Sequence, residues 1–108
     1  MLQQLDPTTL ARRLQQQPDS VVLLDVREPF EREFASILPS LHIPMADIPE
    51  RLSEIPKDRD VVVYCHSGVR SMMVVGYLVE NGFSRVANLL GGIDAWSVRV
   101  DPKVPRYS

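Results

Sequence analysis

Three short apolar runs, rich in β-branched residues, constrain the fold of this chain more than any other feature. They occupy residues 21–24, 61–65 and 86–90, with the sequences VVLL, VVVYC and VANLL. These runs lack the strict alternation of apolar and polar residues that marks a strand with one exposed face, so each is typical of a strand buried on both faces. Buried strands separated by helical segments predict an α/β fold, in which helices cover both faces of a central parallel sheet.

The segments between these runs carry helix signals. Asp6 and Pro7 have the form of a helix start, with Asp6 as the N-cap and Pro7 at the first helical position. Leu10 and Leu14 follow on one face, and Pro18 ends the pattern. The remaining predicted elements are helices over residues 31–34, 49–55 and 71–81 and one after residues 91–92, short strands over 2–5 and 41–43, and an extended tail over 101–107.

Length, charge and cysteine content exclude several classes of protein. The chain has 108 residues, the size of one ordinary domain. Its 12 Lys and Arg residues against 14 Asp and Glu residues give a formal charge of −2, which offers no basic face to a nucleic acid. One cysteine excludes an internal disulfide, and even with His42 and His66 it leaves a zinc cluster almost no ligands. We expect no bound metal and no other cofactor.

The sequence contains no segment typical of membrane insertion or export. Its first residues lack the basic and apolar regions of a signal peptide. The longest apolar run, residues 72–79, has eight residues, where a membrane span needs roughly 18 or more. We expect a cytoplasmic protein without a membrane partner, and an unpaired cysteine suits a reducing compartment.

Cys65 ends the most strand-like run of the chain and precedes a loop and a helix. Ligands of parallel sheets bind at the carboxyl ends of the strands, so Cys65 lies where chemistry is expected. Gly68 can adopt a positive φ, which lets successive backbone N–H groups converge on one point, and the following helix adds N–H groups and the positive end of its dipole. Together with the charge of Arg70, this cradle is expected to favour the thiolate form of Cys65, which is the nucleophilic form.

The alternative interpretation of Cys65 is structural. A lone cysteine at the end of a buried strand commonly packs as a small hydrophobic residue. A packing cysteine needs neither Gly68, nor Arg70, nor a helix start at these spacings. Their presence favours a functional cysteine.

The motif Cys65-x-x-Gly68-x-Arg70-Ser71 after a valine-rich strand resembles the active-site loop of the rhodanese sulfurtransferases. Further segments are similar to that family in the same order: residues 24–28 (LDVRE), 43–44 (IP), 88–96 (NLLGGIDAW) and the tail 101–107. The resemblance implies one rhodanese domain over residues 1–108. It further implies a three-layer fold with a core over about 20–98 and an extended tail over 99–108.

The resemblance also implies a mechanism. The Cys65 thiolate attacks the sulfane sulfur of a donor such as thiosulfate, sulfite leaves, and a thiophilic acceptor (cyanide, a small thiol or a protein cysteine) removes the sulfur from the resulting persulfide. Backbone N–H groups of the loop are expected to stabilise the anionic outer sulfur. The residues assigned to this cradle are His66, Ser67, Gly68, Val69, Arg70 and Ser71.

Two other functions remain open. Related cell-cycle phosphatases and arsenate reductases resemble rhodaneses but have a longer Cys-x5-Arg loop around a tetrahedral oxyanion, whereas four residues separate Cys65 from Arg70. The shorter ring of amides suits one sulfur atom better than a phosphate. The other alternative is a sulfur-relay or regulatory module whose substrate is the cysteine of a partner protein.

Asp25 and Arg27 match the Asp-x-Arg segment of the family at the end of the neighbouring strand. We expect them to support the structure by pairing with each other, or with Arg70 and Glu28. A charged rim for an anionic donor is the alternative role. Residues 35–40 depart from the Gly-His-Ile-Pro-Gly-Ala sequence common in the family, which leaves the loop conformation there open.

Overall fold

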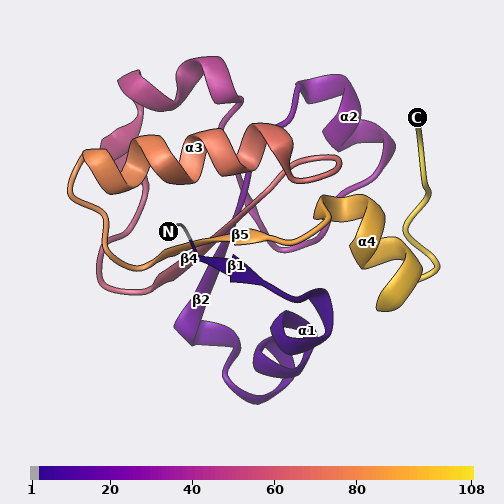
Figure 1. Ribbon diagram of the computed structural model, residues 1–108. Coiled ribbons are helices and arrows are strands. Elements are labelled where there is room, and N and C mark those ends of the chain that lie inside the picture. The colour runs from indigo at the N-terminus through magenta and orange to yellow at the C-terminus, as the bar shows by residue number, and fades with distance from the viewer. Residues whose placement is uncertain (1–2) are drawn as a thin grey trace.

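The computed structural model describes residues 3–108 and confirms the α/β fold with a central parallel sheet (Figure 1). Five strands, all paired in parallel, follow the order β1-β5-β4-β2-β3. The strands are β1 (Gln4–Leu5), β2 (Val21–Asp25), β3 (Leu41–His42), β4 (Asp60–Tyr64) and β5 (Val86–Leu89). The α-helices are α1 (Pro7–Gln16), α2 (Pro29–Phe34), α3 (Val69–Glu80) and α4 (Gly92–Arg99), and the 3-10 helices are η1 (Pro18–Ser20), η2 (Met45–Glu50) and η3 (Leu52–Glu54).

The sheet is buried on both faces because helices pack against each side. Figure 1 shows α3 on one side of the sheet and α1 on the other. Leu10 of α1 and Trp96 of α4 share one apolar cluster with Val62 of β4. On the opposite face, Val75 of α3 belongs to a second cluster with Val63 of β4. Successive side chains of β4 therefore enter different cores, which explains why its valine run shows no polar alternation.

The helix boundaries differ from the predicted ones at three places. Both α2 and α3 begin two residues earlier than predicted, at Pro29 and Val69. The helix predicted over residues 49–55 is wrong, because this segment forms parts of two 3-10 helices, η2 and η3, with Pro49 inside η2. Proline has no N–H to donate and disfavours a continuous α-helix, whereas a short 3-10 turn tolerates it. Of the strand predicted over residues 2–5, residues 4–5 form β1 and residue 2 lies outside the described residues.

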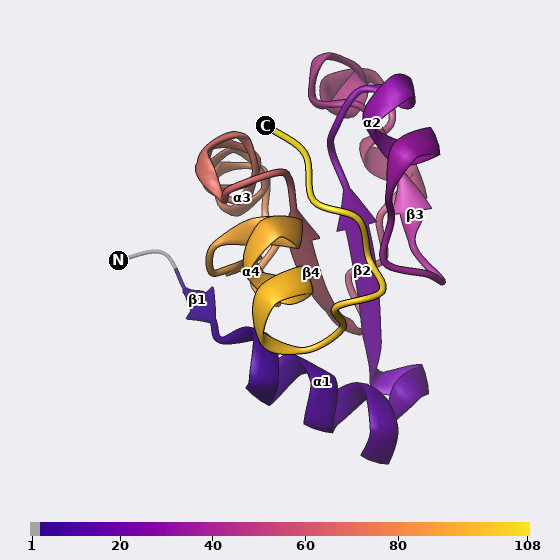
Figure 2. The same ribbon diagram turned by 90° about the vertical axis from the view of Figure 1, so that its right-hand side faces the viewer.

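The carboxyl edge of the sheet brings several loops together. Asp25 and Tyr64 are register partners at the ends of β2 and β4, so the segments that follow them start side by side. Figure 2 shows the C-terminal tail running from α4 past β2 and then up between α3 and α2. Among residues 3–108, no helix has the length and apolar character needed to cross a membrane.

Candidate active site

The Cys65 sulfur lies at the base of the loop between β4 and α3. Its Sγ accepts hydrogen bonds from the backbone N–H of Gly68 at 3.1 Å and of Ser71 at 3.3 Å. Gly68 has a φ of 105°, the left-handed conformation that glycine adopts without strain, and it is the N-cap of α3. The loop therefore folds back so that backbone dipoles point at the sulfur. Only 1% of Cys65 is exposed, so a reagent must enter this cradle to reach it.

The start of α4 fixes the other side of the Cys65 loop. The Ile93 N–H donates to the Cys65 carbonyl at 2.9 Å, and the Asp94 N–H donates to the His66 carbonyl at 3.1 Å. Gly92 makes this approach possible, because a Cβ at that position would lie 2.4 Å from the His66 carbonyl oxygen. First-turn N–H groups of α4, which have no partner within the helix, thus hold the two carbonyls of the loop.

Arg70 faces α2 and pairs with a residue that the sequence motif did not include. Its Nη1 and Nη2 donate to Oε1 and Oε2 of Glu31 at 2.6 and 2.8 Å. Hydrogen bonds from Arg70 are the largest cause that lowers the pKa of Glu31, to about 2, although burial opposes the shift. The same ion pair raises the pKa of Arg70. The charge of Arg70 is therefore compensated by Glu31 and is not a free cation in the cradle.

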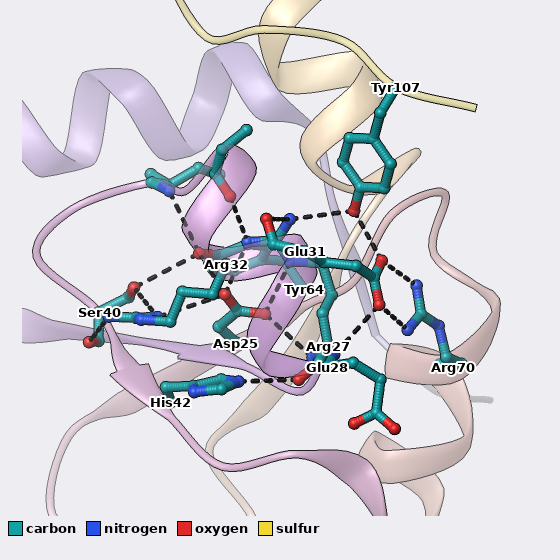
Figure 3. A network of polar contacts seen from close by, with 12 residues as sticks. Asp25, Arg27, Glu28, Glu31, Arg32, Ser40, His42, Tyr64, Arg70 and Tyr107 are labelled. Carbon is teal, nitrogen blue, oxygen red and sulfur yellow. Dashed lines mark hydrogen bonds and ion pairs between the residues drawn. The ribbon is translucent and has the colours of Figure 1, made fainter.

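Asp25 and Arg27 form a fully buried ion pair. Figure 3 shows the two side chains within their network of polar contacts. Arg27 donates from Nε to Asp25 Oδ1 at 2.9 Å and from Nη2 to Asp25 Oδ2 at 2.8 Å. Burial alone would lower the pKa of Arg27, but its hydrogen bonds to Asp25 and Tyr107 raise it. Of the predicted pairings, the structure contains the one between Asp25 and Arg27, while Arg70 instead contacts Glu31. The side chains of Asp25 and Arg27 have no exposed surface, which excludes a role for them as a charged rim.

Tyr107 brings the C-terminal tail into the same network (Figure 3). Its hydroxyl accepts from Arg27 Nη1 at 3.0 Å and donates to Glu31 Oε2 at 2.8 Å. Its ring stacks on the imidazole of His66, with centroids 4.2 Å apart and 17° between the planes. Burial is the largest cause that raises the pKa of Tyr107, to about 12. The tail therefore contacts both the Cys65 loop and the buried ion pair.

Ser71 contributes to the cradle through its backbone more directly than through its side chain. Its N–H donates to Cys65 Sγ, whereas its hydroxyl donates to Asn88 Oδ1 on β5. Asn88 in turn donates from Nδ2 to the Gly68 carbonyl at 3.3 Å. Ser67 and Val69 are exposed, so the loop surrounds the sulfur mainly with main-chain atoms.

The structure thus brings Cys65, Gly68 and Ser71 together and adds three residues that sequence reasoning missed: Glu31, Asn88 and Tyr107. Glu31 had a weak signal, since an acidic residue in a first helical turn is normally explained by capping. Asn88 stood out as a polar residue inside a buried strand. Tyr107 had no signal beyond the family-like tail. Within residues 3–108, no group of three or more His, Cys, Asp or Glu side chains could hold a metal ion.

Several known proteins are similar to this chain in sequence or in fold. A protein of Allochromatium vinosum named sulfurtransferase is 48% identical over 97 residues, which cover 90% of this chain and 90% of that protein. The thiosulfate sulfurtransferase GlpE of Coxiella burnetii is 38% identical over 76 residues, covering 70% of this chain and 71% of that protein. A crystal structure of a rhodanese-related protein from Thermoplasma volcanium matches with a TM-score of 0.84 and 30% identity, covering 97% of this chain and 99% of that chain.

The family assignment follows from these similarities. The Rhodanese-like domain family matches residues 6–99, nearly the whole sheet and its helices. Relatives that the chain covers almost end to end are named sulfurtransferases, which supports a sulfurtransferase role at the level of the family. With its 108 residues, the chain belongs to the rhodanese-like domain family as a member of single-domain size.

Proposed function

We propose that the chain is a rhodanese-type sulfurtransferase that moves a sulfane sulfur from thiosulfate, or from another persulfide donor, to a thiophilic acceptor through a persulfide on Cys65. The observation that carries the proposal is the pair of backbone N–H groups, of Gly68 and Ser71, that converge on Cys65 Sγ. Such donors stabilise a sulfur anion without reacting with it. The similarity to a protein named thiosulfate sulfurtransferase supports thiosulfate as the first donor to test.

The reaction proceeds in two displacements at sulfur. The Cys65 thiolate attacks the outer sulfur of thiosulfate, an S–S bond forms at Sγ, and the S–S bond of thiosulfate breaks so that sulfite leaves with the bonding electron pair. The persulfide anion on Cys65 then presents its outer sulfur to the acceptor. Cyanide, a small thiolate or a protein thiolate attacks that sulfur and restores the Cys65 thiolate, so no external oxidant or reductant is needed.

The chain offers no second cysteine that could capture this sulfur internally. The outer sulfur must therefore leave to an external acceptor, either a small molecule or the cysteine of a partner protein. A protein-to-protein relay is the alternative function, and rapid transfer to one protein thiol with weak turnover on cyanide would favour it. A reducing compartment such as the cytoplasm would keep the Cys65 thiol available.

Phosphatase or arsenate reductase activity is less well supported. Only four residues separate Cys65 from Arg70, and the Arg70 guanidinium is directed at Glu31. An oxyanion in the cradle would therefore lack the free guanidinium that binds phosphate with two hydrogen bonds. Hydrolysis of an aryl phosphate faster than sulfur transfer from thiosulfate would overturn this ranking.

Intact-mass measurement tests the proposal most directly. The protein is incubated with thiosulfate, desalted and weighed beside Cys65→Ser, which keeps the loop but lacks the sulfur nucleophile. We expect the parent alone to gain the mass of one sulfur atom and to lose it again when cyanide is added, with thiocyanate as product. If the mass of the parent increases neither with thiosulfate nor with a persulfide donor, the proposal is wrong.

A further inference from the structure

The Ser71 hydroxyl lies between two polar atoms that compete for its single hydrogen. Its Oγ is 3.3 Å from Cys65 Sγ, and it also contacts Asn88 Oδ1 at hydrogen-bond distance. A serine hydroxyl can donate only one hydrogen bond, while its two lone pairs can accept others. The direction of that hydrogen therefore decides whether Ser71 donates to the sulfur or accepts from it.

The amide of Asn88 has an orientation that its surroundings determine. Asn88 is 2% exposed, and its Nδ2 lies 3.3 Å from the Gly68 carbonyl oxygen and 2.9 Å from Gln4 Oε1. A backbone carbonyl can only accept, so the NH2 group of Asn88 must face Gly68. Its Oδ1 then faces Ser71 and needs a donor, because a buried carbonyl oxygen without a hydrogen bond is costly. The Ser71 hydroxyl is the donor at that site.

We propose that Asn88 is a positioning residue that turns a lone pair of the Ser71 hydroxyl, and not its hydrogen, towards Cys65. In the resting thiol, Ser71 accepts the S–H hydrogen bond. When the thiol loses its proton to solvent, Ser71 gives the anion no third hydrogen bond beside those of the Gly68 and Ser71 N–H groups. The inference rests on the proposed role of Cys65 as sulfur acceptor, and it names the contact that limits how readily the sulfur becomes a nucleophile.

Several charged or titratable groups also surround the Cys65 loop, and they remain the same in every variant proposed below. Arg70 of α3 acts on Cys65 and is paired with Glu31 of α2. His66 lies in the loop, and Asp94 belongs to the first turn of α4. Asn88, which comes from β5, is neutral. A change in thiolate content on substitution of Ser71 or Asn88 therefore reports the hydroxyl and not a changed charge.

The pH dependence of alkylation by iodoacetamide tests the inference, because the chain has one cysteine and only its thiolate reacts. The midpoint is measured for the parent, Ser71→Ala, Asn88→Ala and the double variant. Asn88→Ala frees the Ser71 hydrogen to donate to the thiolate, so we expect its midpoint to fall by about one pH unit, the effect of about one hydrogen bond to a charged group. Ser71→Ala leaves the midpoint unchanged or lowers it, and the double variant matches Ser71→Ala.

The opposite results would overturn the inference. If Ser71 donates to the thiolate in the parent, Ser71→Ala raises the midpoint by about one pH unit. An unchanged or higher midpoint in folded Asn88→Ala contradicts it as well. Should circular dichroism show that Asn88→Ala is unfolded, the sign of the shift in Ser71→Ala decides alone. Gln4→Ala, which removes only the outer partner of Asn88, is the matched control and is expected to leave the midpoint unchanged.

This experiment uses no sulfur donor, so its outcome is separate from that of the proposed function. If the parent takes up sulfur but Ser71→Ala has a raised midpoint, the proposed function stands and the inference is wrong. If the variants show the expected shifts but the parent takes up no sulfur from any donor, the inference about the thiol stands and the proposed function is wrong.

Discussion

Arg70 and Glu31 form a two-point ion pair between α3 and α2, with Nη1–Oε1 at 2.6 Å and Nη2–Oε2 at 2.8 Å. Each residue belongs to the first helical turn after a strand of the sheet, so the pair ties the Cys65 loop to the loop that follows β2. Glu31 also accepts from the Glu28 backbone N–H at 3.1 Å, which completes a capping box at the start of α2. One carboxylate thus stabilises a helix terminus and compensates the cation of the loop.

Glu31→Gln is expected to remove a stabilisation that is present at neutral pH and is lost in acid. The pKa of Glu31 is lowered from 4.5 to about 2, chiefly by Arg70. A carboxylate with a lowered pKa stabilises the fold at pH values above its ordinary pKa. This contribution disappears as the pH falls from about 4.5 to about 2. It corresponds to at most about 3 kcal/mol at neutral pH.

Urea unfolding of the parent and Glu31→Gln between pH 7 and pH 2 measures this contribution. The difference in the free energy of unfolding should shrink across the acid range. Glu33→Gln on the exposed side of α2 is the control, with little expected effect. A difference for Glu31→Gln that stays constant with pH contradicts the assignment.

Tyr107→Phe is expected to destabilise the fold and to change its response to alkaline pH. The variant keeps the ring on His66 but leaves Arg27 and Glu31 without the hydroxyl, a loss of about 1–2 kcal/mol. Because burial raises the pKa of Tyr107 to about 12, the neutral hydroxyl stabilises the fold below pH 10, and this contribution is lost between pH 10 and pH 12.

Unfolding at pH 7 and at successive alkaline pH values compares the parent with Tyr107→Phe and with the control Tyr77→Phe on α3. The deficit of Tyr107→Phe should diminish above pH 10. Equal stability of the parent and Tyr107→Phe at pH 7 would show that the tail does not hold the network.

Asp25→Asn is expected to cost far more than the loss of an exposed ion pair. It leaves the fully buried Arg27 cation without its anionic partner, which typically costs about 3–5 kcal/mol. Glu54→Gln breaks the exposed pair with Arg51 and should leave the free energy of unfolding nearly unchanged. Chemical denaturation of both variants makes the comparison. Similar losses for the two would mean that burial does not govern the Asp25–Arg27 pair.

Local sequence patterns predicted the frame of the site correctly. The valine-rich runs predicted β2, β4 and β5, and their uninterrupted apolar character predicted helices on both faces. The helix predicted after residues 91–92 is α4. Each of these features depends on neighbours in the chain or on the face of a strand, which periodicity can express.

The polar partners of the site could not be predicted because they depend on tertiary register. Asn88 lies beside the start of α3 because it is the register partner of Val63, and no local pattern specifies that pairing. Glu31 and Arg70 are 39 positions apart, and Tyr107 reaches Arg27 across 80 positions. The α-helix predicted over residues 49–55 was wrong for another reason: short 3-10 turns, here η2 and η3, leave a weak periodicity that resembles an α-helix.

Gly92→Ala is expected to disrupt the Cys65 loop from the side of α4. Its added Cβ would lie 2.4 Å from the His66 carbonyl oxygen and 2.5 Å from that of Cys65, and backbone atoms cannot move aside as a flexible side chain can. Gly82→Ala is the matched control, because it has a similar positive φ of 89° but only the Lys57 side chain nearby. Both variants incur left-handed strain of about 1–2 kcal/mol, so the excess loss in Gly92→Ala, at least about 2 kcal/mol, measures the contact with the loop. Thermal unfolding gives this difference, and iodoacetamide reports whether Cys65 becomes more accessible in Gly92→Ala alone. Equal stability of the two variants would mean that the loop can retreat from α4 without cost.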